Sequence, residues 1–332
     1  MIRISRALGL LAAACLASAC LAQPVTLRFS SIEPPQAPLT GQVFIPWTKS
    51  VVEASNGTLA IEMFAGGTLG RNPAQQLKLV LDGVADMTFA ALALTPGRFG
   101  GYEIVEFPFL AQNVRAASLA LWRVFEQGLL TGFDDLKVLS MSTNAPGFIH
   151  SRTPIRSLAD LKGTRLRTSG VWRAKAVEAL GAVPVAIAPT SVAESLAKGV
   201  LDAVLAEWLF VQTFKIDEVV SNHYEMPLGT SVLMVIMLKS KYEALPAPAR
   251  AAIDRFSGEP YVRRMIDVFE ATEESTRARV AKSSRASIAT PSAADVAAWR
   301  KLTDPVLDQW RKESATNERV YQAYTAALPS VR

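Results

Sequence analysis

Stretches in which hydrophobic and polar residues alternate are interleaved along this chain with stretches in which hydrophobic residues recur at helical spacing. Residues 25–30, V-T-L-R-F-S, alternate as a half-buried strand does, whereas Val43, Trp47 and Val51 follow one face of a helix. The first third of the chain predicts strand, helix, strand, helix and strand over residues 25–30, 42–54, 58–64, 73–82 and 85–89. This order with short connections is typical of a parallel sheet covered by helices.

The same order returns in the middle of the chain. Strand, helix, strand, helix and strand are expected over residues 164–168, 171–180, 183–187, 191–198 and 201–205. The two regions share little sequence identity, so the repeat is one of architecture. It predicts two α/β lobes of similar plan that face each other across a cleft.

Three segments are expected to connect the lobes. A strand at residues 137–142 leads into a crossing at residues 144–147, and the apolar strand at residues 231–239 is expected to cross back. Residues 260–284 keep helical period without glycine or an internal proline. At about 1.5 Å per residue, roughly 25 residues give a helix of about 37 Å, which is longer than one small domain needs.

Two serines have the spacing of a capping box, in which a serine and an acidic side chain satisfy free backbone N–H groups at a helix start. Ser191 is followed by Glu194, and Ser292 is followed by Asp295. The second pair is expected to begin an amphipathic helix that carries Trp299.

The first 22 residues have the pattern of a secretory signal. Arg3 and Arg6 precede an apolar stretch rich in Ala and Leu, which is too short for a stable membrane span. Cleavage is expected after Ala22, which places the mature protein in the periplasm. Cys20 offers an alternative lipoprotein site, but the residue three positions before it is Ala17 rather than Leu, which favours simple cleavage.

Removal of the signal changes the composition. Lys+Arg falls from 35 to 33 against 30 Asp+Glu, so the formal charge falls from +5 to +3. Cys15 and Cys20 are also lost, which leaves no disulfide, thiol nucleophile or cysteine metal site. A charge of +3 over about 310 residues is no nucleic-acid signature. No later apolar run approaches the roughly 18 residues of a membrane span.

The sequence offers little for catalysis. It contains no nucleophile elbow, no phosphate loop and no H-E-x-x-H motif. His150 and His223 are the only histidines. Neither a metal site nor a cofactor is therefore expected.

The strongest candidate for ligand binding lies in residues 158–170, L-A-D-L-K-G-T-R-L-R-T-S-G. Arg167 stands at the C-terminal end of the expected strand, where open α/β sheets bind ligands, and Ser169 adjoins the next helix. A guanidinium offers paired donors to a carboxylate, and free N–H groups at a helix start add positive potential. Arg165 lies further back on the same side of the strand. From the residues alone, a surface or interlobe salt bridge remains the alternative for both arginines.

Other candidates follow strands that would reach the same edge. Glu207 and Trp208 come after the last strand of the second repeat, and Phe89 and Ala90 end the matching strand of the first. Trp208 and Phe89 each fit either a ligand contact or a place in the core. His150 lies beside the expected crossing, as a ligand contact or a structural histidine.

Together these stretches resemble the solute-binding proteins of TRAP (tripartite ATP-independent periplasmic) transporters, the DctP-like family. Each motif alone is weak, but their order is specific. The matching motifs are E-A-S-N-G at 53–57, L-G at 69–70, D-G-V-A-D-M at 82–87, P-G-R-F at 96–99, E-F-P-F-L at 106–110, L-A-D-L-K-G at 158–163 with Arg167, A-L-G-A at 179–182 and G-V-L-D at 199–202.

The resemblance implies an α/β, two-lobe periplasmic binding protein (Venus flytrap) fold with a long helix spanning both lobes. Lobe I would comprise residues 23–145 and 232–272, and lobe II residues 146–231 and 273–332. Arg167 would bind the carboxylate of an organic acid between the closing lobes. The protein would be a monomer without enzymatic activity, and it would deliver its ligand to the membrane permease subunits for ion-coupled uptake.

The chain departs from the family pattern at two places. Some members bring a second arginine from the crossing segment, where this chain has G-F-I-H at 147–150, and many have polar residues where it has V-L-A-E-W at 204–208. A single arginine is therefore expected to orient the ligand, against an apolar wall near Trp208. The expected ligand is a monocarboxylate with an apolar or aromatic body, rather than a sialic acid or a C4-dicarboxylate.

Three other functions remain open from the sequence. They are a binding protein of an ATP-driven importer, a ligand-binding partner of a membrane sensor, and a periplasmic hydrolase on the same scaffold. Permease genes beside this one would separate the first from a TRAP protein, and product release from an ester or amide would reveal the last, because a fold alone does not supply chemistry.

Overall fold

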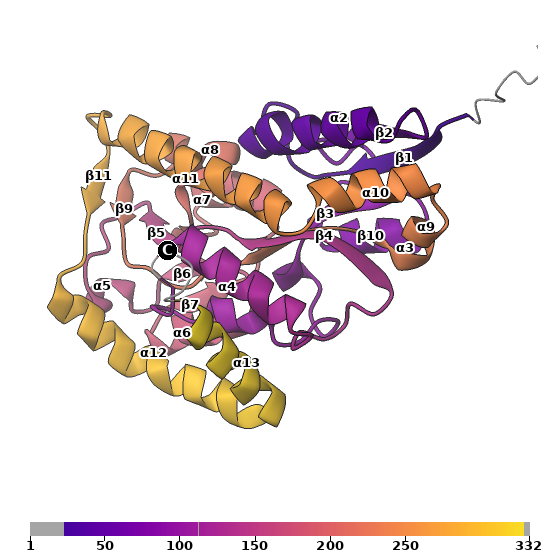
Figure 1. The fold of residues 1–332 in the computed structure, drawn as a ribbon. Helices are drawn as coiled ribbons and strands as arrows, with labels where there is room; N and C mark the ends of the chain where they lie inside the picture. Colours follow the sequence, from indigo (N-terminus) through magenta and orange to yellow (C-terminus); the bar gives the residue numbers. More distant parts are fainter. Residues whose placement is uncertain (1–22, 112, 329–332) are drawn as a thin grey trace, which may run out of the picture.

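The computed structural model describes residues 23–111 and 113–328 of the chain. The expected signal at residues 1–22, with both cysteines, lies outside the described residues. The described chain forms two sheets flanked by helices, with long helices running across both (Figure 1). The α/β class expected from the sequence is confirmed.

The first sheet has five strands in the order β2-β1-β3-β10-β4. β1 pairs in parallel with β2 and β3, whereas β10 runs antiparallel between β3 and β4. Leu27 and Phe29 of β1 are fully buried, as the alternation predicts. The strands are β1 Val25–Ser30, β2 Leu59–Phe64, β3 Met87–Ala91, β4 Leu136–Thr143 and β10 Val232–Leu238.

Two helical segments of this half begin at asparagine caps. The side chain of Asn72 accepts a hydrogen bond from the Ala74 N–H over 3.0 Å, and Asn113 accepts from Ala116 over 2.8 Å. The helices are η1 Thr40–Phe44, α2 Ile45–Ala54, η2 Pro73–Gln75, α3 Gln76–Leu81, η3 Leu92–Leu94, η4 Tyr102–Glu106, α4 Val114–Glu126, α9 Lys239–Glu243 and α10 Ala247–Phe256.

The second sheet has six strands in the order β11-β9-β5-β8-β6-β7. β6 pairs in parallel with β7 and β8, and β5 runs antiparallel to β8 and β9. The strands are β5 Phe148–Ser151, β6 Arg165–Arg167, β7 Val183–Val185, β8 Ala203–Ala206, β9 Asn222–Tyr224 and β11 Ser287–Ala289. The helices are α5 Leu158–Leu161, α6 Val171–Ala179, η5 Pro189–Ser191, α7 Val192–Ala197, α8 Trp208–Thr213 and η6 Ile216–Glu218.

Two chain segments cross between the sheets and pair with each other. The Gly147 N–H donates to the Gly229 carbonyl over 2.8 Å, and the Leu228 N–H donates to the Gly147 carbonyl over 3.0 Å. These bonds hold the two crossings side by side, between β4 and β5 and between β9 and β10.

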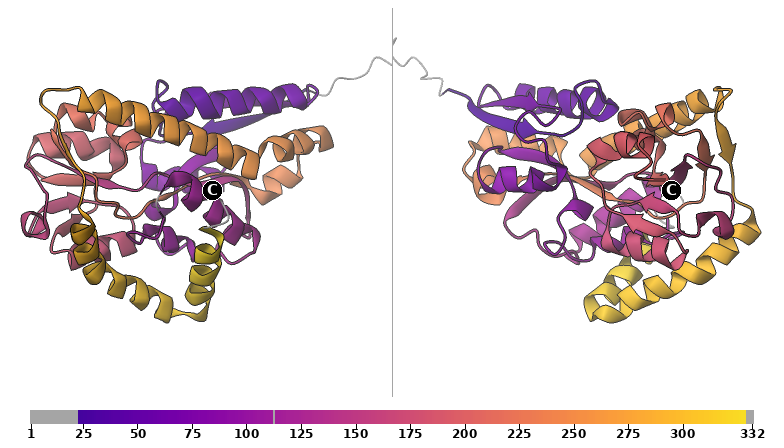
Figure 2. Two further views of the ribbon diagram at one scale, coloured as in Figure 1. Left: turned by 60° about the vertical axis from the view of Figure 1, so that its left-hand side comes forward. Right: turned by 180° about the vertical axis from the view of Figure 1, so that it is seen from behind.

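The long helix predicted from the sequence is α11, Glu259–Ala281. Tyr261 and Phe269 of α11 lie in the core of the first half, whereas Val280 lies in a core of the second. Figures 1 and 2 show the helix running over both halves. The expectation of a two-lobe fold with a helix spanning both lobes is confirmed.

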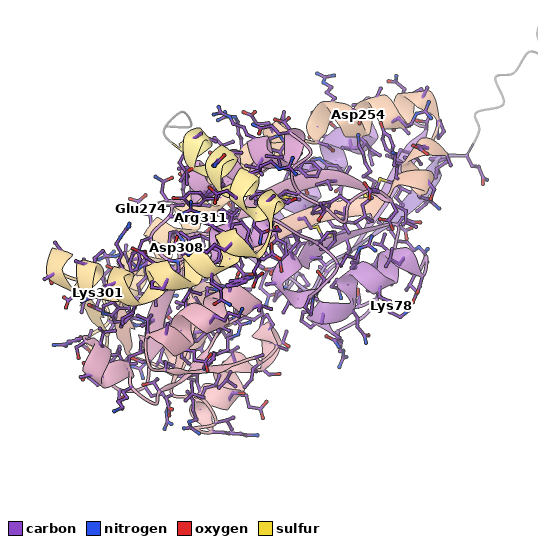
Figure 3. All side chains as sticks on the ribbon, turned by 90° about the horizontal axis from the view of Figure 1, so that it is seen from below. Lys78, Asp254, Glu274, Lys301, Asp308 and Arg311 are labelled. Atoms are coloured by element: carbon purple, nitrogen blue, oxygen red, sulfur yellow. The ribbon has the colours of Figure 1, made fainter. Side chains whose placement is uncertain are left out.

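A second helix, near the C-terminus, also touches both halves. Trp299 packs in a core of the second half, and Trp310 packs in the core of the first. Arg311 forms an ion pair with Asp308 on the same helix over 3.1 Å, and both residues are labelled in Figure 3. Arg311 also forms an ion pair with Glu318 on the next helix over 2.8 Å. The two helices are α12 Ala293–Glu313 and α13 Ala315–Ala327.

The two expected capping boxes have different outcomes. Ser292 and Asp295 form the complete box at the start of α12. Ser191 makes no capping bond with its side chain, and Glu194 instead pairs with Lys198, which caps the C-terminus of α7. The prediction at Ser191 is wrong because the short 3-10 turn of η5 runs straight into α7.

Candidate functional site

A cavity of about 90 Å³ lies between the two sheets. Since a cavity needs roughly 10–15 Å³ to hold one water, this one has room for a small organic molecule. Its walls come from β3 and the loop after β1, from β6, α6, β8 and α8, and from both crossing segments. Five of the residues predicted from the sequence line it: Phe89, Ala90, Arg167, Ser169 and Glu207.

Arg167 ends β6 and enters the cavity, with 4% of the residue exposed. Its Nε donates to the Ile187 carbonyl over 3.1 Å, which fixes the plane of the guanidinium, and the guanidinium carbon lies 5.2 Å from the ring centre of Phe210. Burial, together with the nearby Arg173, lowers the pKa of Arg167 to about 10, so it stays charged at neutral pH. Among the described residues it forms no ion pair with a carboxylate.

Arg165 lies on the same strand but outside the cavity. Its side chain is 45% exposed, and its Nη2 lies 2.6 Å from a carboxylate oxygen of Asp202. The surface ion pair that the sequence left open for both arginines is therefore found at Arg165.

Arg173 lines the same cavity, although the sequence pattern assigned it no role. Its Nε donates to the Ser169 carbonyl over 3.1 Å, and its Nη2 donates to the Ser169 hydroxyl over 3.0 Å and also to the Ser231 hydroxyl. The cavity wall thus carries a second guanidinium beside that of Arg167, which the sequence analysis did not predict. The second comes from the first turn of α6 rather than from the crossing segment.

The N-terminus of α6 is held by a carboxylate from the first half. One oxygen of Glu106 accepts from the Trp172 N–H over 3.0 Å and from the Arg173 N–H over 3.2 Å. Gly170, which precedes the helix, has a φ of +89°, and a Cβ there would lie 2.3 Å from Glu106 Oε1. Burial raises the pKa of Glu106 to about 7, against the opposing effect of Arg173. This contact ties the two halves together beside the cavity.

Most of the remaining cavity wall is apolar. Glu207 is an exception, and burial raises its pKa against the opposing effects of Arg173, Asn144 and Arg167. The apolar residues on the wall include Leu39, Phe89, Ala90, Leu205, Leu209 and Phe210.

Trp208 lies behind the cavity wall, so its expected position is corrected. It is 1% exposed, and its ring centre lies 4.8 Å from that of His150 and 4.9 Å from that of His223. Trp208 begins α8, and Phe210 two positions later reaches the cavity, because successive residues turn by about 100° around a helix.

His150 also lies outside the cavity lining, in a buried pair with His223. The two Nδ1 atoms are 2.8 Å apart, and His150 Nε2 lies 3.0 Å from the Ala206 carbonyl. Since a carbonyl only accepts, the proton of neutral His150 is on Nε2, and its Nδ1 accepts from His223. Burial lowers the pKa of His150 to about 3 and that of His223 to about 4. The structural interpretation of His150 fits this geometry.

Within residues 23–111 and 113–328, no group of three or more His, Cys, Asp or Glu is placed to hold a metal ion. In the same part of the chain, no helix is both long and apolar enough to cross a membrane.

The cavity offers two buried guanidiniums and a largely apolar wall, a combination that suits an organic anion.

A family model described as bacterial extracellular solute-binding protein, family 7 (DctP), matches residues 29–313. The chain belongs to this family. The resemblance to TRAP solute-binding proteins is thereby confirmed, and with it a role in transport outside the cytoplasm. DctP-family proteins bind small organic acids and work with membrane permease subunits.

Known proteins resemble this DctP-family chain over most of its length. It is 25% identical over 306 residues to the outer membrane transporter protein TsaT of Comamonas testosteroni, covering 89% of this chain and 88% of that one. A solved marine-metagenome TRAP solute-binding protein specific for aromatic acid ligands, in complex with 3-hydroxybenzoate, is 27% identical with a TM-score of 0.87, covering 93% and 99% of the two chains. A TRAP protein of Rhodoferax ferrireducens, in complex with benzoate, is 26% identical with a TM-score of 0.86, covering 92% and 98%.

Proposed function

We propose that the chain captures an organic monocarboxylate with an apolar or aromatic body in the cavity between its sheets. It then delivers this ligand to the permease of a TRAP transporter for ion-coupled uptake. The observation that carries the proposal is the pair of buried guanidiniums, Arg167 and Arg173, in a cavity with largely apolar walls.

Arg167 is the proposed anchor of the carboxylate. Its Nε is occupied by the Ile187 carbonyl, which leaves the two terminal amino groups to meet both carboxylate oxygens. Ser169 accepts from Arg173 and so can donate its own hydroxyl proton to the ligand. Glu207 limits the excess of positive charge around the anion.

The ligand body is proposed to lie against Phe89, Ala90 and Phe210. Burial of an apolar body there adds affinity in proportion to its area, at roughly 25 cal/mol per Å². The aromatic acids bound by the marine-metagenome and Rhodoferax ferrireducens proteins support this ligand class.

Capture is proposed to involve closure of two lobes in a monomer. Lobe I comprises residues 23–145 and 232–272, and lobe II comprises residues 146–231 and 273–332. The paired crossings and α11 connect the lobes, and α13 packs against α4 of lobe I. Ligand contacts from both sheets give the closed form its advantage when the cavity is filled.

A ligand screen tests the proposal. Thermal unfolding is measured with benzoate, 4-methyl-2-oxopentanoate, succinate and malate, and each ligand that raises the melting temperature is titrated calorimetrically. A ligand present at a concentration 100 times its dissociation constant adds about 2.7 kcal/mol to the free energy of unfolding. We expect stabilisation by the first two acids. Tight binding of succinate or malate, with none for benzoate or the branched 2-oxo acid, would refute the proposed ligand class.

A further inference from the structure

One charged side chain on the cavity wall has no partner among the described residues. Glu33, in the loop after β1, is 7% exposed and lines the cavity. Its Oε2 is buried, and no hydrogen bond within residues 23–111 and 113–328 reaches it. Thr213 of α8 also lines the cavity. Its hydroxyl oxygen is buried and likewise has no hydrogen-bond partner in the described part of the chain. The cavity wall therefore carries two buried polar atoms that have no hydrogen-bond partner within the described residues.

Within the described residues, no hydrogen bond of the fold uses the side chain of Glu33, because its loop is held through the Glu33 backbone. The Glu33 N–H donates to the Ser31 hydroxyl over 3.0 Å, and its carbonyl accepts from the Gly66 N–H over 2.8 Å. The nearby Gln76 differs, because its side chain accepts from Ser30 over 2.9 Å and donates to the Gly70 carbonyl over 2.7 Å. A buried polar group without a partner is costly, and its retention calls for a use outside the fold.

The surroundings of Glu33 restrict what it can bind. Burial, followed by the like charge of Glu207, raises the pKa of Glu33 to about 7. Near neutral pH the carboxyl therefore populates a protonated form that donates and an ionised form that accepts. A hydroxyl group pairs with both forms, because it is donor and acceptor at once. A ketone loses its partner when Glu33 ionises, and a carboxylate is then repelled.

We propose that Glu33 recognises a hydroxyl group on the ligand body, away from the carboxylate. The substrate class is accordingly hydroxy-substituted monocarboxylic acids. This inference rests on the proposed function, because Arg167 must first fix the carboxylate for a second contact to select among ligand bodies. Glu33 is thus a specificity-determining residue, and Arg167 the residue that any carboxylate needs.

Calorimetric titration of ligand pairs tests the proposal. The probes are benzoate, phenylacetate and the three ring-hydroxylated isomers of each acid. This set offers a hydroxyl group at several distances from the carboxylate, so that one of them can reach Glu33 however deep in the cavity the ring lies. The proteins are the wild type, Glu33→Leu, Glu33→Gln and Arg167→Ala. In the wild type, at least one hydroxylated isomer should bind about tenfold more tightly than its parent acid.

The variants separate recognition from folding. Glu33→Leu should remove the preference for the hydroxyl while parent acids bind as before or better, and the unliganded protein should keep or raise its melting temperature, because leucine fills the space without a buried polar group. Glu33→Gln keeps a donor and an acceptor, so it should retain most of the preference. A lower melting temperature for Glu33→Leu, with the preference intact, would mean that the side chain has a structural role and would overturn the proposal.

The proposed function and this inference fail in different ways. If none of these acids binds the wild type, or if Arg167→Ala binds them unchanged, the proposed function fails and the inference with it. If the parent acids bind through Arg167 but no hydroxylated isomer binds more tightly, or Glu33→Leu leaves the preference unchanged, the inference alone is refuted.

Discussion

Replacing Arg167 with alanine should remove most of the affinity for a carboxylate ligand while leaving the unliganded fold nearly intact. Within the described residues, the fold makes one hydrogen bond to this guanidinium, from Nε to the Ile187 carbonyl over 3.1 Å. A hydrogen bond of this kind contributes about 1 kcal/mol. The variant also removes a buried cation, which offsets part of that loss. A small change in the melting temperature of the free protein is therefore expected.

The loss of binding should be much larger. A carboxylate left in a closed cavity without its partner costs about 3–5 kcal/mol. At 25 °C this corresponds to an increase of roughly 150- to 5,000-fold in the dissociation constant. Arg167→Lys should lie between alanine and the wild type, because an ammonium cannot bond both carboxylate oxygens in one plane.

Calorimetric titration with benzoate measures these changes. Arg165→Ala is the matched control, since it removes the same side chain from the same strand at an exposed position paired with Asp202. It should bind within about threefold of the wild type, as surface ion pairs contribute little. Retention of more than a tenth of the affinity by Arg167→Ala would refute the anchor. Loss in Arg165→Ala with retention in Arg167→Ala would show that the other arginine binds the ligand.

Three further changes test other parts of the structure. Phe210→Leu should weaken benzoate binding by about 3- to 10-fold in calorimetry, because leucine lacks the ring that lies 5.2 Å from the cavity guanidinium. Gly170→Ala should lower the melting temperature of the free protein by more than about 4 °C, since its Cβ would lie 2.3 Å from Glu106 Oε1 at a φ of +89°. The stability contributed by the His150–His223 pair should fall as pH is lowered from 6.5 to 4, because burial lowers the two pKa values to about 3 and about 4 and the unfolded chain therefore binds more protons in that range. Urea unfolding of the wild type and of the double variant His150→Leu/His223→Leu measures this effect. Between pH 6.5 and 4, the free energy of unfolding should fall less in the double variant than in the wild type.

Each of these changes has its own control. Unchanged benzoate binding in Phe210→Leu would show that the contact between the Phe210 ring and the Arg167 guanidinium does not contribute to ligand affinity. Gly163→Ala has a φ of +72° and no atom within 4 Å of the new Cβ, so it carries the backbone strain without the collision and should cost less. If the two substitutions lowered the melting temperature equally, the collision with Glu106 would not be the cause of the destabilisation by Gly170→Ala. Parallel stability curves for the wild type and the histidine variant would contradict the assignment of the acid loss to this pair.

The sequence predicts the elements of its two repeated regions, the three-residue strands β6 and β7 included, but it does not predict the short strands β5 and β9. β1 and α11 are long enough for a period to be visible, and both were predicted close to their observed bounds. β5, F-I-H-S, and β9, N-H-Y, have four and three residues and no alternation, because both faces are packed within the second half. They form strands because a neighbouring strand is there to pair with, which is tertiary information.

Some residues of the candidate site could likewise be predicted from the sequence, and others could not. Arg167 could be predicted because the end of a strand is visible in the sequence. Phe210 was missed in favour of Trp208, since the choice depends on the residue at which α8 begins. Arg173 was missed because its place on the wall depends on how α6 docks, and Glu33 because its loop reaches the cavity only when the two halves are assembled. An arginine in the first turn after Ser169 and Gly170 was nevertheless a signal that could have been used.

The charges around the cavity favour one ligand carboxylate over two. Arg167 keeps its charge at neutral pH even with its pKa lowered to about 10, whereas burial raises the pKa of Glu106 to about 7 and also raises that of Glu207. Glu106 is therefore partly neutral near pH 7, and the two guanidiniums are incompletely compensated until an anion binds. A single carboxylate restores the balance. A second one would have to leave water for the apolar wall or for the neighbourhood of Glu33, at a cost of several kcal/mol that no further cation on the described wall offsets. If the proposed function holds, the burial that favours one bound carboxylate therefore selects against a ligand with two.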